Sequence, residues 1–95
     1  MTAVALGNDS MAMGLMSAAA GQGLRIPDDL SVVGNDDIHE ARYLTPPLTT
    51  VAVEFEAEGR MLVDRLLAAV EPEEPSTEVA ALPRLIARGS SRALR

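Results

Sequence analysis

The sequence predicts an α/β domain built on a parallel sheet, and three observations along its 95 residues lead to that prediction. A short apolar run over residues 2–7 has the composition of a strand buried on both faces. A helix-length segment without proline follows it, and residues 30–35 form a second apolar run. A strand, a full-length helix and a strand in this order make a βαβ unit, whose two strands run parallel.

The first helix is expected to begin at Asn8 or Asp9, because these residue types are common N-caps. Gly21 and Gly23 are expected to end it, one of them as the residue after the C-cap. Its apolar residues lie all round the helix, which predicts cover on more than one side. Two interpretations stay open. The helix is either an ordinary alanine-rich helix with an exposed apolar strip or a helix at a subunit or domain interface, and the second is favoured.

Further elements follow the βαβ unit. A turn of helix is expected within residues 38–43, a third strand over residues 48–53 and a second helix over residues 54–71. The apolar stripe of that helix includes Phe55, Leu62, Leu66 and Val70. Two strand-like pieces, residues 78–82 and 84–90, are separated by Pro83 and come after a loop over residues 71–77.

The composition limits the classes of function. Eight basic and fourteen acidic residues give a net charge of −6, and only 2% of the residues are aromatic. An acidic surface repels phosphate backbones and anionic lipids, so the chain alone is not expected to bind DNA or a membrane. The chain has no cysteine, no apolar run of about 20 residues and no basic start typical of a signal peptide. These features predict a cytoplasmic protein.

The sequence offers little for catalysis. His39 is the only histidine, so histidines cannot build a metal cluster. The serines lie outside the nucleophile-elbow pattern, and the glycines form neither a phosphate-binding loop nor a dinucleotide fingerprint. We therefore expect neither enzymatic activity nor a metal or other cofactor.

Polar residues follow both strands of the βαβ unit at their carboxyl ends. Asn8 and Asp9 come after the first strand, and Asp36 and Asp37 after the second. Ligands of open α/β sheets bind at this edge, and carboxylates suit sugar hydroxyls or an amine. Each cluster could instead cap the helix or turn that follows. The spacing alone does not decide between ligand binding and capping. Because two such clusters lie at one edge of the sheet, the case for ligand binding is stronger for both.

The motifs "NDSMAMG", "GLRIPDDLSVVG", "DDI", "ARYLTPPLTTV" and "ARGS" occur in this order nearly from end to end of the chain. Together they resemble the effector-binding domain of LacI/GalR-family transcription regulators. The resemblance implies two α/β lobes around a ligand cleft, as in periplasmic sugar-binding proteins, and side-by-side homodimers. It also implies DNA binding through a helix-turn-helix headpiece that is missing from this chain, which would be the C-terminal part of that design.

The resemblance further implies how the chain is divided between the lobes. Residues 1–50 would form a βαβ unit of the second lobe, and residues 78–95 would be returning C-terminal strands. Residues 51–77 would form a crossover strand and a helix that packs on the first lobe. Because that helix would lack its sheet here, we expect the isolated chain to be unstable or to associate with a molecule that supplies the missing surface.

Individual residues take roles from the same resemblance. Asn8, Asp36 and Phe55 match positions at or near the effector, and Asp37 is expected to cap the following turn. Asn35 and His39 depart from the family pattern, which commonly has an aromatic residue and a proline there. The dimer surface would include Met11, Met13, Leu15, Met16, Tyr43 and Leu44.

The leading hypothesis is therefore the ligand-sensing fragment of a sugar- or nucleoside-responsive transcription regulator. One alternative is a fragment of a periplasmic sugar-binding protein for transport, which an upstream signal peptide would distinguish from a regulator. The other is a non-functional truncated remnant, which a cooperative melting transition that shifts on adding sugars would exclude.

Overall fold

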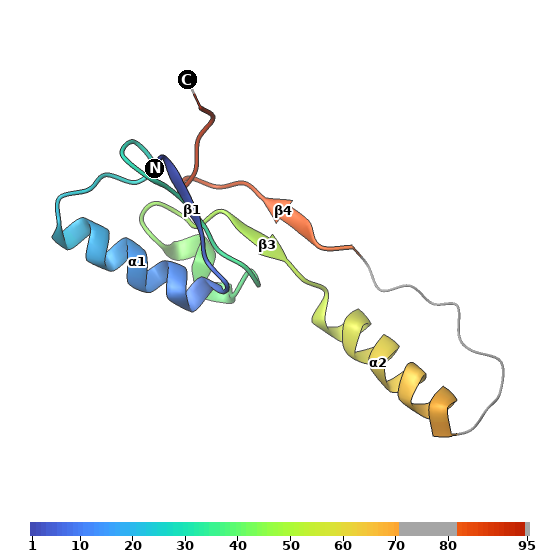
Figure 1. Ribbon diagram of the computed structural model, residues 1–95. Coiled ribbons are helices and arrows are strands. Elements are labelled where there is room, and N and C mark those ends of the chain that lie inside the picture. Colours follow the sequence, from blue (N-terminus) through green and yellow to red (C-terminus); the bar gives the residue numbers. More distant parts are fainter. Residues whose placement is uncertain (71–81, 95) are drawn as a thin grey trace. The chain divides into compact units, whose positions relative to one another are not determined.

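A computed structural model describes residues 1–70 and 82–94 of the chain (Figure 1). It divides into two compact units, Met1–Ala52 with Arg84–Arg95, and Val53–Pro83. The predicted loop over residues 71–77 and most of the predicted strand over residues 78–82 lie outside the described residues. The elements are β1 (Ala3–Ala5), α1 (Asp9–Gly21), β2 (Ser31–Val33), the 3₁₀ helix η1 (His39–Tyr43), β3 (Thr50–Ala52), α2 (Phe55–Val70) and β4 (Arg84–Ile86).

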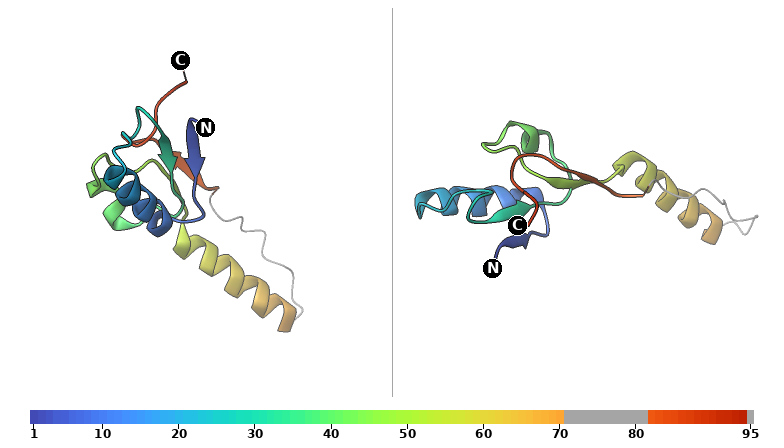
Figure 2. Two further views of the ribbon diagram at one scale, coloured as in Figure 1. Left: turned by 60° about the vertical axis from the view of Figure 1, so that its left-hand side comes forward. Right: turned by 90° about the horizontal axis from the view of Figure 1, so that it is seen from above.

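The first unit contains the predicted βαβ arrangement. Strands β1 and β2 pair in parallel, with Ala3 opposite Ser31 and Ala5 opposite Val33. Helix α1 joins them and lies on one side of the pair (Figure 2). From the last residue of β2 onward the chain makes isolated parallel bridges to the segment of β3, Val33 with Thr49 and Asp36 with Ala52. Strand β3 pairs antiparallel with β4. The predicted α/β class with parallel strands is confirmed.

The core of the first unit is small and made of aliphatic side chains. Its buried members come from α1, β2, η1 and the start of the third strand segment, and they are Ala12, Met16, Val32, Ala41 and Leu48. Strand β1 contributes less than the sequence predicts, since Ala3 and Ala5 are exposed and Val4 is half-buried. The prediction that this strand is buried on both faces is wrong, because β1 is the edge of a two-stranded sheet with α1 on one side.

Helix α1 begins and ends where its polar and glycine residues predict. The side chain of Asn8, the N-cap, accepts a hydrogen bond of 2.8 Å from the Met11 amide. At the other end Gly23 has a φ of 77°, and its neighbour Leu24 donates from its amide to the Ala19 carbonyl at 2.9 Å. This is the glycine-dependent ending in which a left-handed residue lets the chain fold back on the last turn.

Helix α2 belongs to the second unit and has no buried residue. Its start and end agree with the prediction to within a residue, and Arg60 and Glu56 form an ion pair of 2.9 Å one turn apart. Neither described helix is long and apolar enough to cross a membrane. The predicted apolar stripe is open, with exposed side chains at Phe55, Leu62, Leu66, Leu67 and Val70.

Candidate functional site

The loops that follow β1 and β2 lie against each other in the first unit. The Leu6 amide donates to the Val33 carbonyl at 2.8 Å, and the Asp9 amide donates to the Asn35 carbonyl at 3.0 Å. These two bonds continue the parallel pairing of the strands beyond their carboxyl ends. The structure therefore brings Asn8 and Asp36 to one edge of the sheet, as the strand order predicts.

Asn8 fills the cap role that the sequence offers for it. Its side-chain oxygen is used by the cap of α1. Its side-chain NH₂ group donates no hydrogen bond to any described residue, although the residue is half-buried. An asparagine held by its oxygen presents its two N–H donors in a defined direction.

Asp36 is held by its backbone in a conformation that side chains rarely adopt. Its φ is 120°, and its amide donates to the Val51 carbonyl at 2.9 Å. Its carboxylate accepts no hydrogen bond from the residues that the structure describes. A non-glycine residue with such a φ costs about 1–3 kcal/mol and persists where its surroundings impose it, commonly at a functional site. A half-buried carboxylate without a protein donor is available to accept hydrogen bonds from a ligand.

Asp37 has a different role from the predicted one. The cap position of η1 is Ile38, and no side chain caps that turn. The Asp37 carboxylate instead accepts a hydrogen bond of 2.8 Å from Arg88, in an ion pair whose side chains are only 19% and 17% exposed. The predicted cap is therefore wrong, because a partner 51 residues further along the chain cannot be read from local spacing.

Asp9 is fully buried and is the center of a network that the sequence did not indicate. Its Oδ1 accepts a hydrogen bond of 2.6 Å from the Thr50 hydroxyl, and its Oδ2 accepts one of 2.8 Å from the Ile38 amide. A side chain on Gly34 would overlap this carboxylate, so glycine is required there. The only sequence signal was that Asp9 follows the residue that caps α1.

The remaining predicted residues are distributed over both units. Phe55 is the first residue of α2 in the second unit and is 62% exposed. Of the predicted dimer surface, Met11 and Tyr43 are exposed, whereas Met16 is buried in the core. The other three, which are Met13, Leu15 and Leu44, are half-buried.

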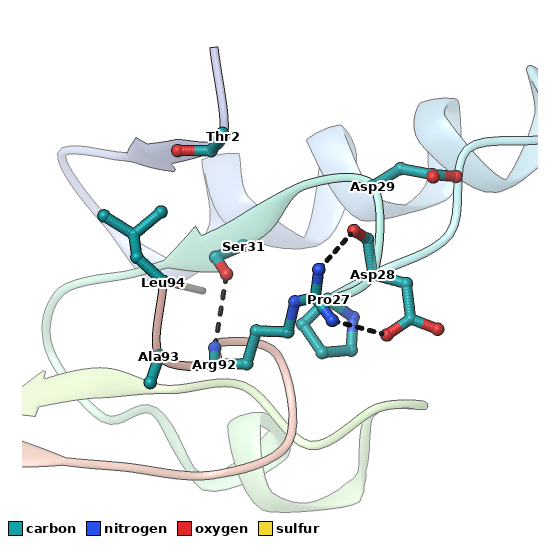
Figure 3. A pocket seen from close by; sticks show the side chains of 8 residues that line it. All are labelled: Thr2, Pro27, Asp28, Asp29, Ser31, Arg92, Ala93 and Leu94. Carbon is teal, nitrogen blue, oxygen red and sulfur yellow. Dashed lines mark hydrogen bonds and ion pairs between the residues drawn. The ribbon is translucent and has the colours of Figure 1, made fainter.

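A hollow of about 210 Å³ lies at the opposite end of β2 from Asp36 (Figure 3). Arg92 crosses it, with its amide bonded to the Ser31 hydroxyl at 3.2 Å and its guanidinium 3.6 Å from Asp28. The neighbouring Asp29 accepts hydrogen bonds from Arg25, and these lower the pKa of its carboxyl. Each charged group here already has a partner within the chain. Among the described residues no three acidic, histidine or cysteine side chains gather as a metal site would require.

A family model of the periplasmic binding protein-like domain matches residues 1–91. The HTH-type transcriptional repressor PurR of Glaesserella parasuis serovar 5 (strain SH0165) is 41% identical over 100 residues, covering 98% of this chain and 29% of that protein. PurR of Salmonella paratyphi B (strain ATCC BAA-1250 / SPB7) is 44% identical over 93 residues, covering 94% and 26%.

Two solved structures share the fold. The lac repressor dimer bound to operator and the anti-inducer ONPF aligns with a TM-score of 0.83 at 37% identity, covering 97% of this chain and 32% of that one. A sugar-binding LacI-family regulator from Escherichia coli, complexed with phosphate, aligns with a TM-score of 0.79 at 31% identity, covering 94% and 32%. The chain thus spans about a third or less of each relative. It belongs to the periplasmic binding protein-like domain family, in the form found in LacI-family transcription regulators.

Proposed function

We propose that the chain is the effector-sensing part of a cytoplasmic transcription regulator, and that its effector is a sugar or a nucleoside. Asn8 and Asp36 of the first unit contact the effector. The role of Phe55 near the effector stays a prediction from the family resemblance. DNA is contacted by a headpiece outside these 95 residues, in keeping with the net charge of −6. The similarity to transcriptional repressors, and to a LacI-family regulator described as sugar-binding, supports this class of function.

The Asp36 carboxylate, which has no donor among the described residues, is the observation that carries the proposal. It lies at the carboxyl edge of a parallel pair, on a strained backbone that is tied down by its own amide. Asp36 supplies acceptors and the Asn8 NH₂ group supplies donors at the same edge. Sugar and nucleoside hydroxyls both donate and accept hydrogen bonds, so they match this pair of groups.

A titration of the isotopically labelled chain tests the proposal. Pentoses, hexoses and nucleosides are added singly, while the Asp36 amide and the Asn8 side-chain NH₂ signals are followed by NMR. At least one compound is expected to shift both signals, and Asp36→Ala is expected to abolish its binding. Asp28→Asn is the matched control at the opposite end of β2 and should bind normally. Equal binding by Asp36→Ala and the native chain would remove Asp36 from the site.

The dimer surface is a second part of the proposal. Met11 is 56% exposed and Tyr43 is 69% exposed, and an apolar hollow of about 300 Å³ lies beside Met16, Leu24 and Pro46. Exposed apolar surface of this kind marks contacts between proteins. Sedimentation equilibrium of Met11→Glu is expected to show weaker dimerisation than the native chain, and Ser10→Glu, one position earlier, is the control for added charge. Equal dimerisation by both variants would place the dimer contact elsewhere.

A further inference from the structure

We infer that the buried carboxylate of Asp9 is a positioning group that holds the loop of residues 35–38, and with it Asp36, against β3. The inference rests on the proposed function only in taking Asp36 as the group that meets the effector. Asp9 itself has no exposed surface and therefore contacts no effector.

Three segments of the chain meet at Asp9. Asp9 begins α1, and its amide bonds the Asn35 carbonyl. Its carboxylate accepts from Ile38 at the far end of the same loop and from Thr50 in β3. Asp9 thus bonds both ends of a four-residue loop, Asn35 through its amide and Ile38 through its carboxylate. Of the two residues between those ends, Asp36 is the one whose side chain has no partner among the described residues.

The absence of a side chain at Gly34 lets the backbone approach the Asp9 carboxylate closely. A Cβ atom on Gly34 would overlap Asp9 Oδ1 and come within 3.0 Å of Leu48 Cδ2. The carboxylate therefore occupies the volume that any larger residue would fill. The two positions therefore constrain each other, because the Asp9 carboxylate fits only while residue 34 is a glycine.

The same contacts link the loop to the strand that leads out of the first unit. The loop is bonded to β3 by the Asp36 amide on Val51, the Asp37 amide on the Thr50 hydroxyl and the Asp9 carboxylate on that hydroxyl. Strand β3 ends at Ala52, the last residue of the first unit before the chain enters the second unit. Because of these hydrogen bonds, an effector that displaces Asp36 also displaces β3. Conversely, a β3 in fixed position keeps Asp36 in the position that binds the effector. Such coupling between two sites is reciprocal.

Amide hydrogen exchange of the full chain tests the positioning role without any ligand. In Asp9→Ala the Ile38 and Asp36 amides are expected to exchange about tenfold faster, relative to amides of α1 and β2, because the hydrogen bond that holds the loop is lost. Ser90→Ala is the matched control. It removes two buried side-chain hydrogen bonds, to Val32 and Thr49, without touching residues 34–38. It is expected to change exchange evenly through the unit.

Two further variants keep the test decisive if Asp9→Ala does not fold. Gly34→Ala displaces the carboxylate and should loosen the same two amides, whereas Asp9→Asn keeps an acceptor for Ile38 and should protect them. In the double variant Asp9→Ala/Gly34→Ala the added methyl group meets no carboxylate, so it should be less harmful than in the native background. The inference is wrong if Gly34→Ala or Asp9→Ala leaves the loop as protected, relative to the rest of the unit, as Ser90→Ala does.

Failure of the proposed function gives a different result. If no sugar or nucleoside binds the native chain but Asp9→Ala still loosens the loop selectively, the effector role of Asp36 fails and the positioning role stands. If a compound binds at Asp36 but the loop amides do not exchange selectively faster in Asp9→Ala, only the positioning role of Asp9 fails.

Discussion

Two adjacent aspartates with the same formal charge have opposite surroundings. Both Asp36 and Asp37 have positive φ values, of 120° and 56°. The Asp37 carboxylate is satisfied by Arg88, whereas the Asp36 carboxylate has no donor among the described residues. The pair that looks like one acidic cluster in sequence thus divides into a structural residue and a candidate ligand contact.

Replacing Asp36 by glycine is expected to stabilise the chain while removing the proposed effector contact. Glycine adopts a φ of 120° without steric cost, and relief of that strain outweighs the added entropy of the unfolded chain, for a net gain of about 1 kcal/mol. Urea denaturation followed by circular dichroism measures the change. Asp37→Gly is the control, because it loses the Arg88 ion pair and should be less stable than the native chain. A loss of stability in Asp36→Gly would contradict the strain argument.

Arg88→Met is expected to lower the free energy of unfolding by about 1–3 kcal/mol, since it strips charged hydrogen bonds from the largely buried Asp37 and from the Leu48 carbonyl. Arg92→Met is the matched change, because the Arg92–Asp28 pair is longer and more exposed and contributes about 0–1 kcal/mol. Chemical denaturation of both variants gives the comparison. Equal losses would mean that burial does not strengthen the Asp37–Arg88 pair.

At the scale of elements, local chemistry and tertiary packing act on different parts of the same helix. The ends of α1 are determined by Asn8 and Gly23, whose roles depend only on residues within four positions of them. Its buried face includes the charged Asp9 beside Ala12, Met16 and Ala19, which no apolar periodicity would select. Caps are local and therefore predictable, while the burial of a charge needs partners from distant segments.

Two glycines of this region are expected to respond oppositely to alanine. Gly14 is in the interior of α1 with open space around it, so Gly14→Ala should raise the free energy of unfolding by about 0.5–1 kcal/mol. Gly23 also has open space, but its φ of 77° makes Gly23→Ala destabilising by about 1 kcal/mol. Thermal unfolding of the two variants measures the pair. Changes of the same sign would contradict the backbone explanation.

At the scale of the whole molecule, the two units differ in how much apolar surface they bury. The first unit has a continuous small core, whereas the second contains a helix with no buried residue. The predicted first-lobe partner of this helix stays a prediction. An open apolar stripe on an amphipathic helix promotes association in water, because burying it is favourable.

The double variant Leu62→Glu/Leu66→Glu is expected to reduce self-association of the chain without altering the unfolding of the first unit. Both leucines are more than half exposed, so the substitutions remove apolar surface without opening a cavity. Sedimentation velocity over a range of concentrations measures the association. Thr2→Glu/Ala93→Glu adds the same charge to exposed positions outside α2 and outside the proposed dimer surface, and it controls for repulsion. Association that falls equally in both variants would show that charge, not the stripe, is responsible.

The sequence alone determined the features that depend on nearby residues. These are the strand–helix–strand order, a helix start at Asn8 or Asp9, a glycine ending at Gly21 or Gly23, the limits of α2 and the family resemblance. Hydrophobic periodicity and helix capping depend on residues a few positions apart, so they can be predicted from one sequence.

Tertiary structure decided what the polar residues at the sheet edge do. It buried Asp9 against Thr50 and paired Asp37 with Arg88, and both outcomes depend on residues that follow many positions later. It left Asp36 without a side-chain partner among the described residues. It also exposed β1, because the burial of a strand depends on its neighbours and not on its own composition. Hydrogen bonds and burial are long-range properties of the folded chain, and local sequence does not contain them.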